Sequence, residues 1–292
     1  MTGTATSPAR ARVEARLDDI VRENRFTIAV VFPVTGAVLL VASAKGLLAF
    51  TVGPYAVSLN FDPYLVLTGV LVMRLPLIAG VAPLVTRKAG YALGALTAYA
   101  YAIEFTGVTT GLPYGEFRYL VDLGPMIAGE IPVALPVFFF PLVLNSYLLC
   151  LLLLGDRADS PAIRLPVTVA SVVAMDLVLD PAAVSLGFWA YTGGGPYYGV
   201  PLSNYAGWVV SAAVAVAAFD WGFRRTGLLE RVRSCGFMLD DLVSFVILWG
   251  AVNAYFGNWV AVAVAALFGA GLLATDRFDF DVRGSVPLAG RF

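Results

Sequence analysis

The sequence predicts an all-α polytopic membrane protein with about eight transmembrane helices and both termini in the cytoplasm. The first observation is composition: of 292 residues, 59% are hydrophobic and 13% are charged, and the mean hydropathy is +0.82. Soluble domains do not have this composition. The second observation is the grouping of the apolar residues into eight runs, each close to the ~20 residues that cross a bilayer. The runs are residues 26–50, 63–84, 89–106, 131–154, 165–187, 205–223, 240–256 and 258–275.

The third observation is that basic residues occupy alternate loops. One side of the predicted membrane holds 16 of the 19 Lys and Arg residues, and the loops of the other side hold only Arg118. The side rich in Lys and Arg is cytoplasmic by the positive-inside rule. We therefore expect a cytoplasmic lead-in (1–25), a single transmembrane domain (26–275) and a cytoplasmic tail (276–292) in a multi-pass protein of the cell membrane. The 16 residues are Arg10, Arg12, Arg16, Arg22, Arg25, Arg87, Lys88, Arg157, Arg164, Arg224, Arg225, Arg231, Arg233, Arg277, Arg283 and Arg291.

The fifth run contains two carboxylates, Asp176 and Asp180. An ionised side chain is costly inside a bilayer, so such residues are candidates for function. Their i, i+4 spacing places both on one helix face. Asp180-Pro181 also has the pattern of a helix N-cap followed by Pro at the first helical position. We therefore expect a broken helix near Asp180-Pro181, with a second short helix through Trp189 and Tyr191. A purely structural alternative is that Asp180 caps a helix and Asp176 pairs with a buried Arg.

Other polar residues are expected in the outer half of the bilayer. Glu104 ends the third run, Glu130 begins the fourth, and Asp122, Tyr191 and Asn204 lie in or beside the outer loops. Five carboxylates with one nearby Arg cannot all be ionised in apolar surroundings, so some are expected to carry a proton. A protonated carboxylic acid beside an ionised one is an acid/base pair facing lipid.

The remaining composition narrows the chemistry. The chain has no His, and Cys150 and Cys235 lie in an apolar run and a basic loop. Haem ligation by His, His-rich di-iron sites and a His base are therefore excluded, and a disulfide is disfavoured. The net charge of −1 gives no indication of nucleic-acid binding. We expect no metal or cofactor. One reaction open to such a site is protonation of a lipid alkene, followed by capture of the tertiary carbocation by water.

Several motifs occur together between residues 90 and 225: Glu104-Phe-Thr-Gly107, Pro113-Tyr-Gly-Glu-Phe117, Glu130-Ile-Pro132, Asn145-Ser-Tyr147, Asp176-x-x-x-Asp180-Pro181 and Gly187-x-Trp189-x-Tyr191. In combination they resemble the carotenoid-biosynthesis integral membrane family. The resemblance implies addition of water to the terminal double bonds of an acyclic carotenoid without a cofactor. In the halophile branch it implies conversion of the C50 carotenoid bisanhydrobacterioruberin to bacterioruberin. The implied partners are the carotenoid, water, the bilayer and other carotenoid-pathway membrane enzymes.

We assign hypothetical roles within that reaction. Arg74 is expected to pair with Asp176 near the middle of the membrane, which would keep Asp176 ionised as counter-charge or base. Asp180 or Glu104 is then the expected neutral proton donor. Each aromatic residue could instead be a packing or lipid-facing residue. The residues expected to assist catalysis, position water or substrate, or line the pocket are Glu130, Asn204, Asp122, Asn145, Tyr191, Trp189 and Phe139.

Three other functions remain open at this point. A membrane prenyltransferase similar to lycopene elongase would bind Mg²⁺-diphosphate through an Asp-x-x-x-Asp motif. Against it, Val172 stands where the larger motif has Asn, and the Asp pair is predicted to face outward. A proton-coupled transporter would use the acids as relays, but no inverted repeat is visible. A pigment-binding protein without catalysis would leave the carotenoid unchanged.

Overall fold

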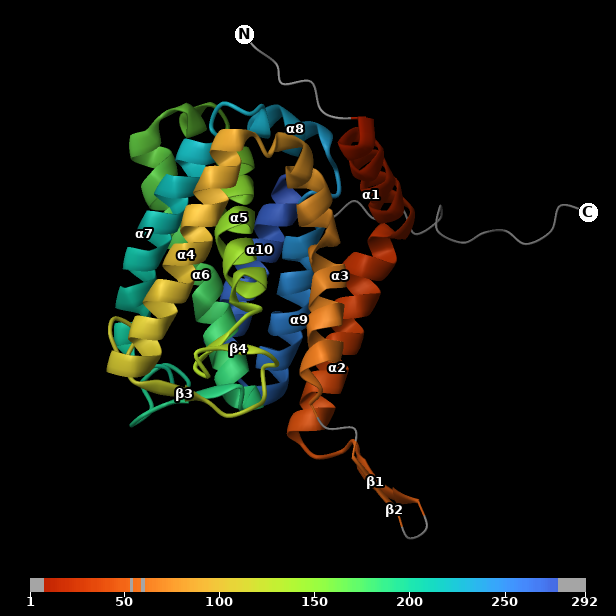
Figure 1. Ribbon diagram of the computed structural model, residues 1–292, viewed down its shortest axis with the longest axis vertical. Helices are drawn as coiled ribbons and strands as arrows, with labels where there is room; N and C mark the ends of the chain where they lie inside the picture. The colour runs from red at the N-terminus through yellow and green to blue at the C-terminus, as the bar shows by residue number, and fades with distance from the viewer. Residues whose placement is uncertain (1–7, 53–54, 59–60, 278–292) are drawn as a thin grey trace, which may run out of the picture.

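The protein is an all-α bundle with short β-hairpins at one end (Figure 1). The structure is a computed structural model that describes residues 8–52, 55–58 and 61–277. The last 15 residues of the predicted tail and the first seven of the lead-in lie outside the described residues. The helices are α1 (Pro8–Phe26), a π-helical turn (Thr27–Val31), α2 (Phe32–Ala44), α3 (Pro63–Val81), α4 (Arg87–Thr110), α5 (Leu135–Leu154), α6 (Pro161–Leu186), α7 (Leu202–Phe223), α8 (Leu228–Ser234), α9 (Asp240–Phe256) and α10 (Trp259–Ala274), with 3₁₀ turns at Ala82–Leu84 and Gly155–Asp159.

Every predicted apolar run contains a helix, although the run 26–50 ends in a strand and the run 131–154 begins in one, and the polytopic all-α class is confirmed. Five helical segments within the described residues are long and apolar enough to cross a membrane, whereas α10 is a shorter apolar helix. The two ends of the described chain lie at the same end of the bundle. Arg231 of α8 binds Asp18 of α1 at 3.1 Å, and Arg277 donates to the carbonyl oxygens of Arg233 and Cys235. The number of spans and their orientation stay predictions.

Helix α6 occupies the centre of the bundle, in contact with α5, α7, α9 and α10. The expectation of a break at Asp180-Pro181 was wrong, because α6 continues through Pro181 to Leu186 and ends at the left-handed Gly187. A proline removes the helical hydrogen bond to the carbonyl four residues earlier, here that of Leu177. The hydroxyl of Tyr197 donates to this carbonyl at 3.0 Å and replaces the missing bond. The helix can therefore remain continuous, and Trp189–Tyr191 forms a strand (β6) instead of a helix.

The expected pairing of Arg74 with Asp176 was also wrong. Arg74 of α3 forms a buried ion pair with Asp241 at the start of α9. The adjacent Asp240 binds Arg25 of α1 at 2.8 Å. Successive helical residues point ~100° apart, so this acid pair reaches two different helices. A buried charge is tolerated when it is paired, and the partner of Arg74 comes from α9 and not from α6.

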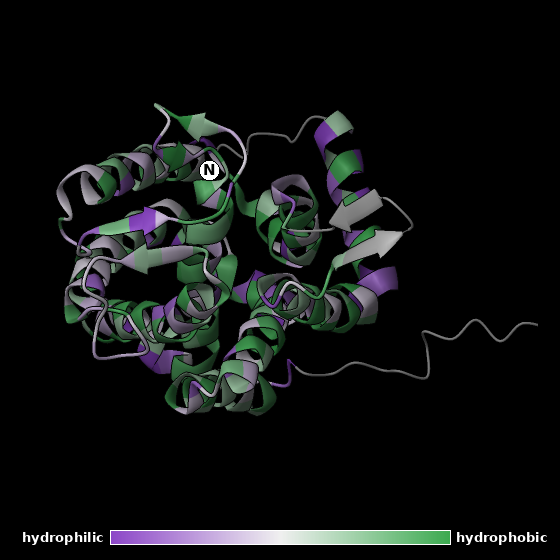
Figure 2. Ribbon diagram, turned by 90° about the horizontal axis from the view of Figure 1, so that it is seen from below, coloured by the Kyte–Doolittle hydropathy of each residue, from purple (hydrophilic) through white to green (hydrophobic). Residues whose placement is uncertain are grey.

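Three short sheets lie at the end of the bundle opposite α8, and one of them is a hairpin after α2 that projects away from the helices (Figure 1). Figure 2 views this end of the bundle end-on. The sheets pair β1 (Ala49–Val52) with β2 (Tyr55–Ser58), β3 (Phe117–Tyr119) with β6 (Trp189–Tyr191), and β4 (Met126–Ile127) with β5 (Ile131–Pro132). In the β3–β6 sheet Phe117 is opposite Tyr191 and Tyr119 is opposite Trp189. Side chains alternate along a strand, so these four aromatic residues share one face. That face closes the cavity described next.

Candidate active site

A cavity lies between the β3–β6 sheet and helices α3, α4, α5, α6 and α7. Its empty volume is about 1230 Å³, which includes the open space at its mouth. Apolar and aromatic side chains form most of the lining, with a few polar groups among them, as is usual for a small-molecule site. The polar lining side chains are Glu104, Asp176, Asp180 and Asn204, together with the tyrosines Tyr114, Tyr119 and Tyr191.

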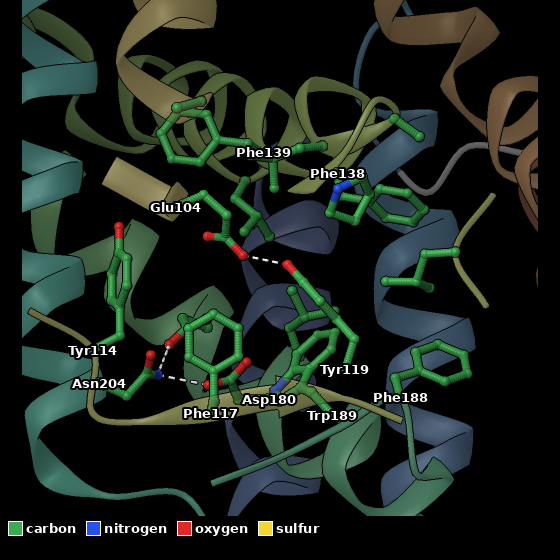
Figure 3. A pocket seen from close by; sticks show the side chains of 18 of the residues that line it. Glu104, Tyr114, Phe117, Tyr119, Phe138, Phe139, Asp180, Phe188, Trp189 and Asn204 are labelled. Carbon is green, nitrogen blue, oxygen red and sulfur yellow. Dashed lines mark hydrogen bonds between the residues drawn. The ribbon is translucent and has the colours of Figure 1, made fainter. Parts of the chain in front are cut away.

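One amide group joins the two aspartates of α6 (Figure 3). The Nδ2 atom of Asn204 donates to Oδ2 of Asp176 at 2.8 Å and to Oδ2 of Asp180 at 2.6 Å. The Tyr191 hydroxyl donates a further hydrogen bond to Oδ2 of Asp180 at 2.9 Å. The second oxygen of Asp176, Oδ1, is buried without a partner in the described part of the chain. The two aspartates therefore differ in the number of donors that each accepts.

Glu104 belongs to a second hydrogen-bonded unit at the same cavity. Its Oε1 accepts a hydrogen bond from the Tyr119 hydroxyl, which reaches α4 from strand β3 (Figure 3). The ring of Tyr119 packs edge-on against Phe117 and Trp189, with centroid distances of 5.7 and 6.5 Å. The β3–β6 sheet thus brings one tyrosine to each side of the cavity, Tyr119 to Glu104 and Tyr191 to Asp180.

These tyrosines keep their protons. Burial, followed by the charge of Glu104, raises the pKa of Tyr119 well above its usual value. Burial, followed by the charges of Asp180 and Asp176, likewise raises the pKa of Tyr191. A neutral phenol can donate its proton to a carboxylate oxygen. Both hydroxyls are therefore donors that hold the carboxyl groups in place.

Aromatic rings form the remaining walls. Phe139 of α5 stacks on Trp208 of α7, with ring centroids 5.8 Å apart and planes inclined by 22°. Tyr114 binds Ser211 at 2.6 Å between hydroxyl oxygens, and its ring packs closely against Gly207. A Cβ at residue 207 would stand 2.6 Å from the Tyr114 ring, so only glycine allows this close approach. Ring faces of this kind attract a cation.

Comparison with known proteins agrees with these features. A family model described as "Carotenoid biosynthesis protein" matches residues 61–272. The chain belongs to this family. It is also 60% identical over 282 residues to a bisanhydrobacterioruberin hydratase of Haloarcula japonica, a match that covers 97% of this chain and 94% of that protein. No solved structure matches the chain. The family membership expected from the motifs is confirmed.

The structure brings together seven of the eleven residues that the sequence analysis selected. Three acids from two helices meet at one cavity, although they are up to 76 positions apart in the sequence. Their roles in a reaction stay predictions. The seven lining residues are Glu104, Phe139, Asp176, Asp180, Trp189, Tyr191 and Asn204.

The other four selected residues lie away from the cavity. Glu130 and Asp122 are exposed in the connection that contains β4 and β5, where Asp122 accepts a hydrogen bond from the backbone of Gly124. Asn145 donates to Asp241 and thereby joins the Arg74 ion pair. The prediction for Glu130 and Asp122 rests on expected membrane depth alone, and depth does not determine the side of a helix bundle to which a loop residue points.

Sequence reasoning missed Tyr119, Tyr114, Phe117 and Trp208 as lining residues. A signal for two of them was present, because Phe117-Arg118-Tyr119 and Trp189-Ala190-Tyr191 both alternate aromatic residues with period two. Such alternation indicates short strands with one aromatic face. Tyr114 and Trp208 had no comparable local signal, because their positions depend on packing between the loop and α7.

Proposed function

We propose that this protein is a carotenoid hydratase that adds water to the terminal C=C bonds of an acyclic C50 carotenoid. The observation that carries the proposal is the Asp176–Asn204–Asp180 unit inside an aromatic cavity. The identity to a bisanhydrobacterioruberin hydratase supports the choice of bisanhydrobacterioruberin as substrate and bacterioruberin as product. The apolar helices support action within a membrane, and we place the protein in the cell membrane.

The hydrogen bonds indicate which aspartate is the acid and which is the fixed charge in the proposed reaction. Oδ2 of Asp180 accepts two hydrogen bonds, from Tyr191 and Asn204, and such donors favour a charged carboxylate. Asp176 accepts one, and its Oδ1 has no donor in the described part of the chain. We assign Asp176 as the acid that gives its proton to the alkene and Asp180 as the fixed negative charge. These roles are the reverse of those predicted from an Arg74–Asp176 pair.

The reaction then follows from charge. Transfer of the Asp176 proton to the CH carbon of a trisubstituted double bond leaves a tertiary carbocation. The carbocation is stabilised by the Asp180 carboxylate and by the ring faces of Trp208, Phe139 and Phe117. Water adds to the cation, and loss of one proton from the added water completes a tertiary alcohol. The chemistry requires no group beyond the side chains and water, so we propose a reaction without a cofactor.

The same geometry is poorly suited to the prenyltransferase alternative. Mg²⁺ binds through oxygen ligands. Here the Asn204 amide places an N–H donor between the two carboxylates, at hydrogen-bond distance from both. This position is the one that a bridging cation would need. The arrangement therefore favours an amide donor over a metal ion between the two carboxylates.

The test is expression in a host that makes an acyclic carotenoid with prenyl-type ends. Pigments are separated by chromatography and weighed by mass spectrometry. A hydratase yields products heavier by one or two waters with an unchanged visible absorption. A gain of five carbons would instead support the prenyltransferase, and unchanged pigment bound to folded protein would contradict catalysis. An Asp176→Asn protein of equal abundance is the control for host enzymes.

A further inference from the structure

The acid step leaves unassigned the group that removes a proton from the added water. Asp176 becomes a carboxylate in that step, but its Oδ2 already accepts the Asn204 amide and its Oδ1 is fully buried. Asp180 already accepts two hydrogen bonds at one oxygen. Glu104 is the remaining carboxyl group among the cavity-lining residues. It stands on α4, across from the aspartates of α6, and has no cationic partner among the described residues.

The contacts of Glu104 orient it toward the cavity. Oε1 accepts the Tyr119 hydroxyl, whereas Oε2 has no hydrogen-bond partner among the described residues. Oε2 is not fully buried and keeps accessible surface. An acceptor of this kind, on a carboxylate that lines the cavity, is placed to bind a water molecule.

Tyr119 is held more firmly than a surface tyrosine. Its strand pairs with β6, and its ring packs against Phe117 and Trp189. The hydroxyl retains its proton for the reasons given above, so it acts on Glu104 as a donor only. The lining of the cavity thus includes a rigid donor that fixes one oxygen of Glu104 and leaves the other for water.

We infer that Tyr119 is a positioning residue that holds Glu104 as the base for the attacking water. The inference rests on the proposed hydratase function. In the complete cycle Asp176 loses a proton to carbon, water forms the C–O bond, and Glu104 receives one proton from that water. Transfer of a proton from Glu104 back to Asp176 restores the starting state, so the sum is one alkene plus one water giving one alcohol.

A distinctive consequence concerns the fate of the carbocation. When water is held by a base, the cation is captured. When it is not, the Asp176 carboxylate takes a proton back from carbon and regenerates the alkene. In D₂O the acid of Asp176 carries deuterium, because it exchanges with solvent, so the alkene CH carbon becomes a CHD group next to the cation. Loss of the H of this group, and not of its D, regenerates an alkene that carries deuterium at its vinylic carbon. The ratio of deuterated alkene to alcohol therefore measures how well water is positioned.

The experiment compares wild type with Tyr119→Phe in membranes supplied with the acyclic carotenoid in D₂O. Phe keeps the ring contacts and removes only the hydroxyl. We expect hydration to fall about 10²-fold, within the usual effect of general-base catalysis. Deuterium exchange into the recovered alkene should fall far less, so the ratio of exchange to hydration rises. Glu104→Gln should raise the same ratio.

The matched control is Tyr101→Phe. Tyr101 lies on the same helix as Glu104 and donates to the backbone of Val133 at 2.7 Å, outside the cavity lining. It should keep the wild-type ratio. An unchanged ratio in Tyr119→Phe and Glu104→Gln, whether or not their rates fall, would overturn the inference while wild-type hydration upholds the proposed function. Absence of alcohol from wild type would overturn both.

Discussion

The hydroxyl of Tyr197 donates a 3.0 Å hydrogen bond to the carbonyl oxygen of Leu177. This carbonyl is the acceptor that Pro181 leaves without its helical donor. The contact joins the loop between β6 and α7 to the segment of α6 that carries Asp176 and Asp180. It explains how a proline can stand one residue after Asp180 without breaking the helix.

A double-mutant cycle tests whether the Tyr197 hydroxyl replaces the N–H that Pro181 lacks. Tyr197→Phe leaves the Leu177 carbonyl unpaired and should cost about 1–3 kcal/mol of stability. Pro181→Ala restores the backbone N–H, so the same Tyr197→Phe change should cost much less in that background. Thermal denaturation of the purified protein in detergent measures both values. Equal costs in the two backgrounds would show that the hydroxyl does not compensate for the proline.

The proposed acid predicts the effect of isosteric amides. Asp176→Asn removes the transferable proton, and hydration should fall about 10²- to 10⁴-fold. Asp180→Asn removes the fixed charge opposite the carbocation and should also slow hydration. Conversion of the carotenoid at equal protein abundance is the measurement.

Glu130→Gln is the matched control for these amides, because Glu130 is exposed outside the cavity. It should retain hydration close to wild type. Loss of hydration in Glu130→Gln with normal folding would mean that the connection containing β4 and β5 contributes to the reaction.

The Arg74–Asp241 pair predicts a stability effect. Arg74→Met leaves Asp241 buried without its cation and should destabilise the fold by about 3–5 kcal/mol. The double variant Arg74→Met with Asp241→Leu removes both charges and should recover most of that loss. Thermal denaturation measures stability, and pigment conversion measures activity. A stable but inactive double variant would return Arg74 to the list of functional residues.

The contact of Gly207 with Tyr114 predicts a steric effect. Gly207→Ala puts a methyl group against the ring and should cost about 1–3 kcal/mol or displace Tyr114 into the cavity. Gly90→Ala is the control, because nothing lies within 4 Å of a Cβ there. Stability and carotenoid conversion should both fall in Gly207→Ala, and both should stay at the wild-type level in Gly90→Ala. Equal behaviour of the two variants would contradict the close approach.

Some parts of the site could be predicted because their signals are local. Asp176 and Asp180 stand out in an apolar run, and their spacing places them on one helix face whatever the rest of the fold does. The prediction of a break at Pro181 was wrong because it used only the local helix propensity of proline. The hydrogen-bond donor that keeps the helix continuous comes from Tyr197, 20 positions from the Leu177 carbonyl.

The amino-acid sequence by itself determined the all-α membrane class, the approximate positions of the helices and the candidate acids of α6 and α4. Hydropathy and helical periodicity depend on neighbouring residues, so these features can be seen in short windows. Only the tertiary structure decided that Arg74 pairs with Asp241, 167 positions away, and that Tyr119 binds Glu104. A buried charge or hydroxyl must find some partner, but packing of the helices chooses which of several chemically equivalent groups comes within reach.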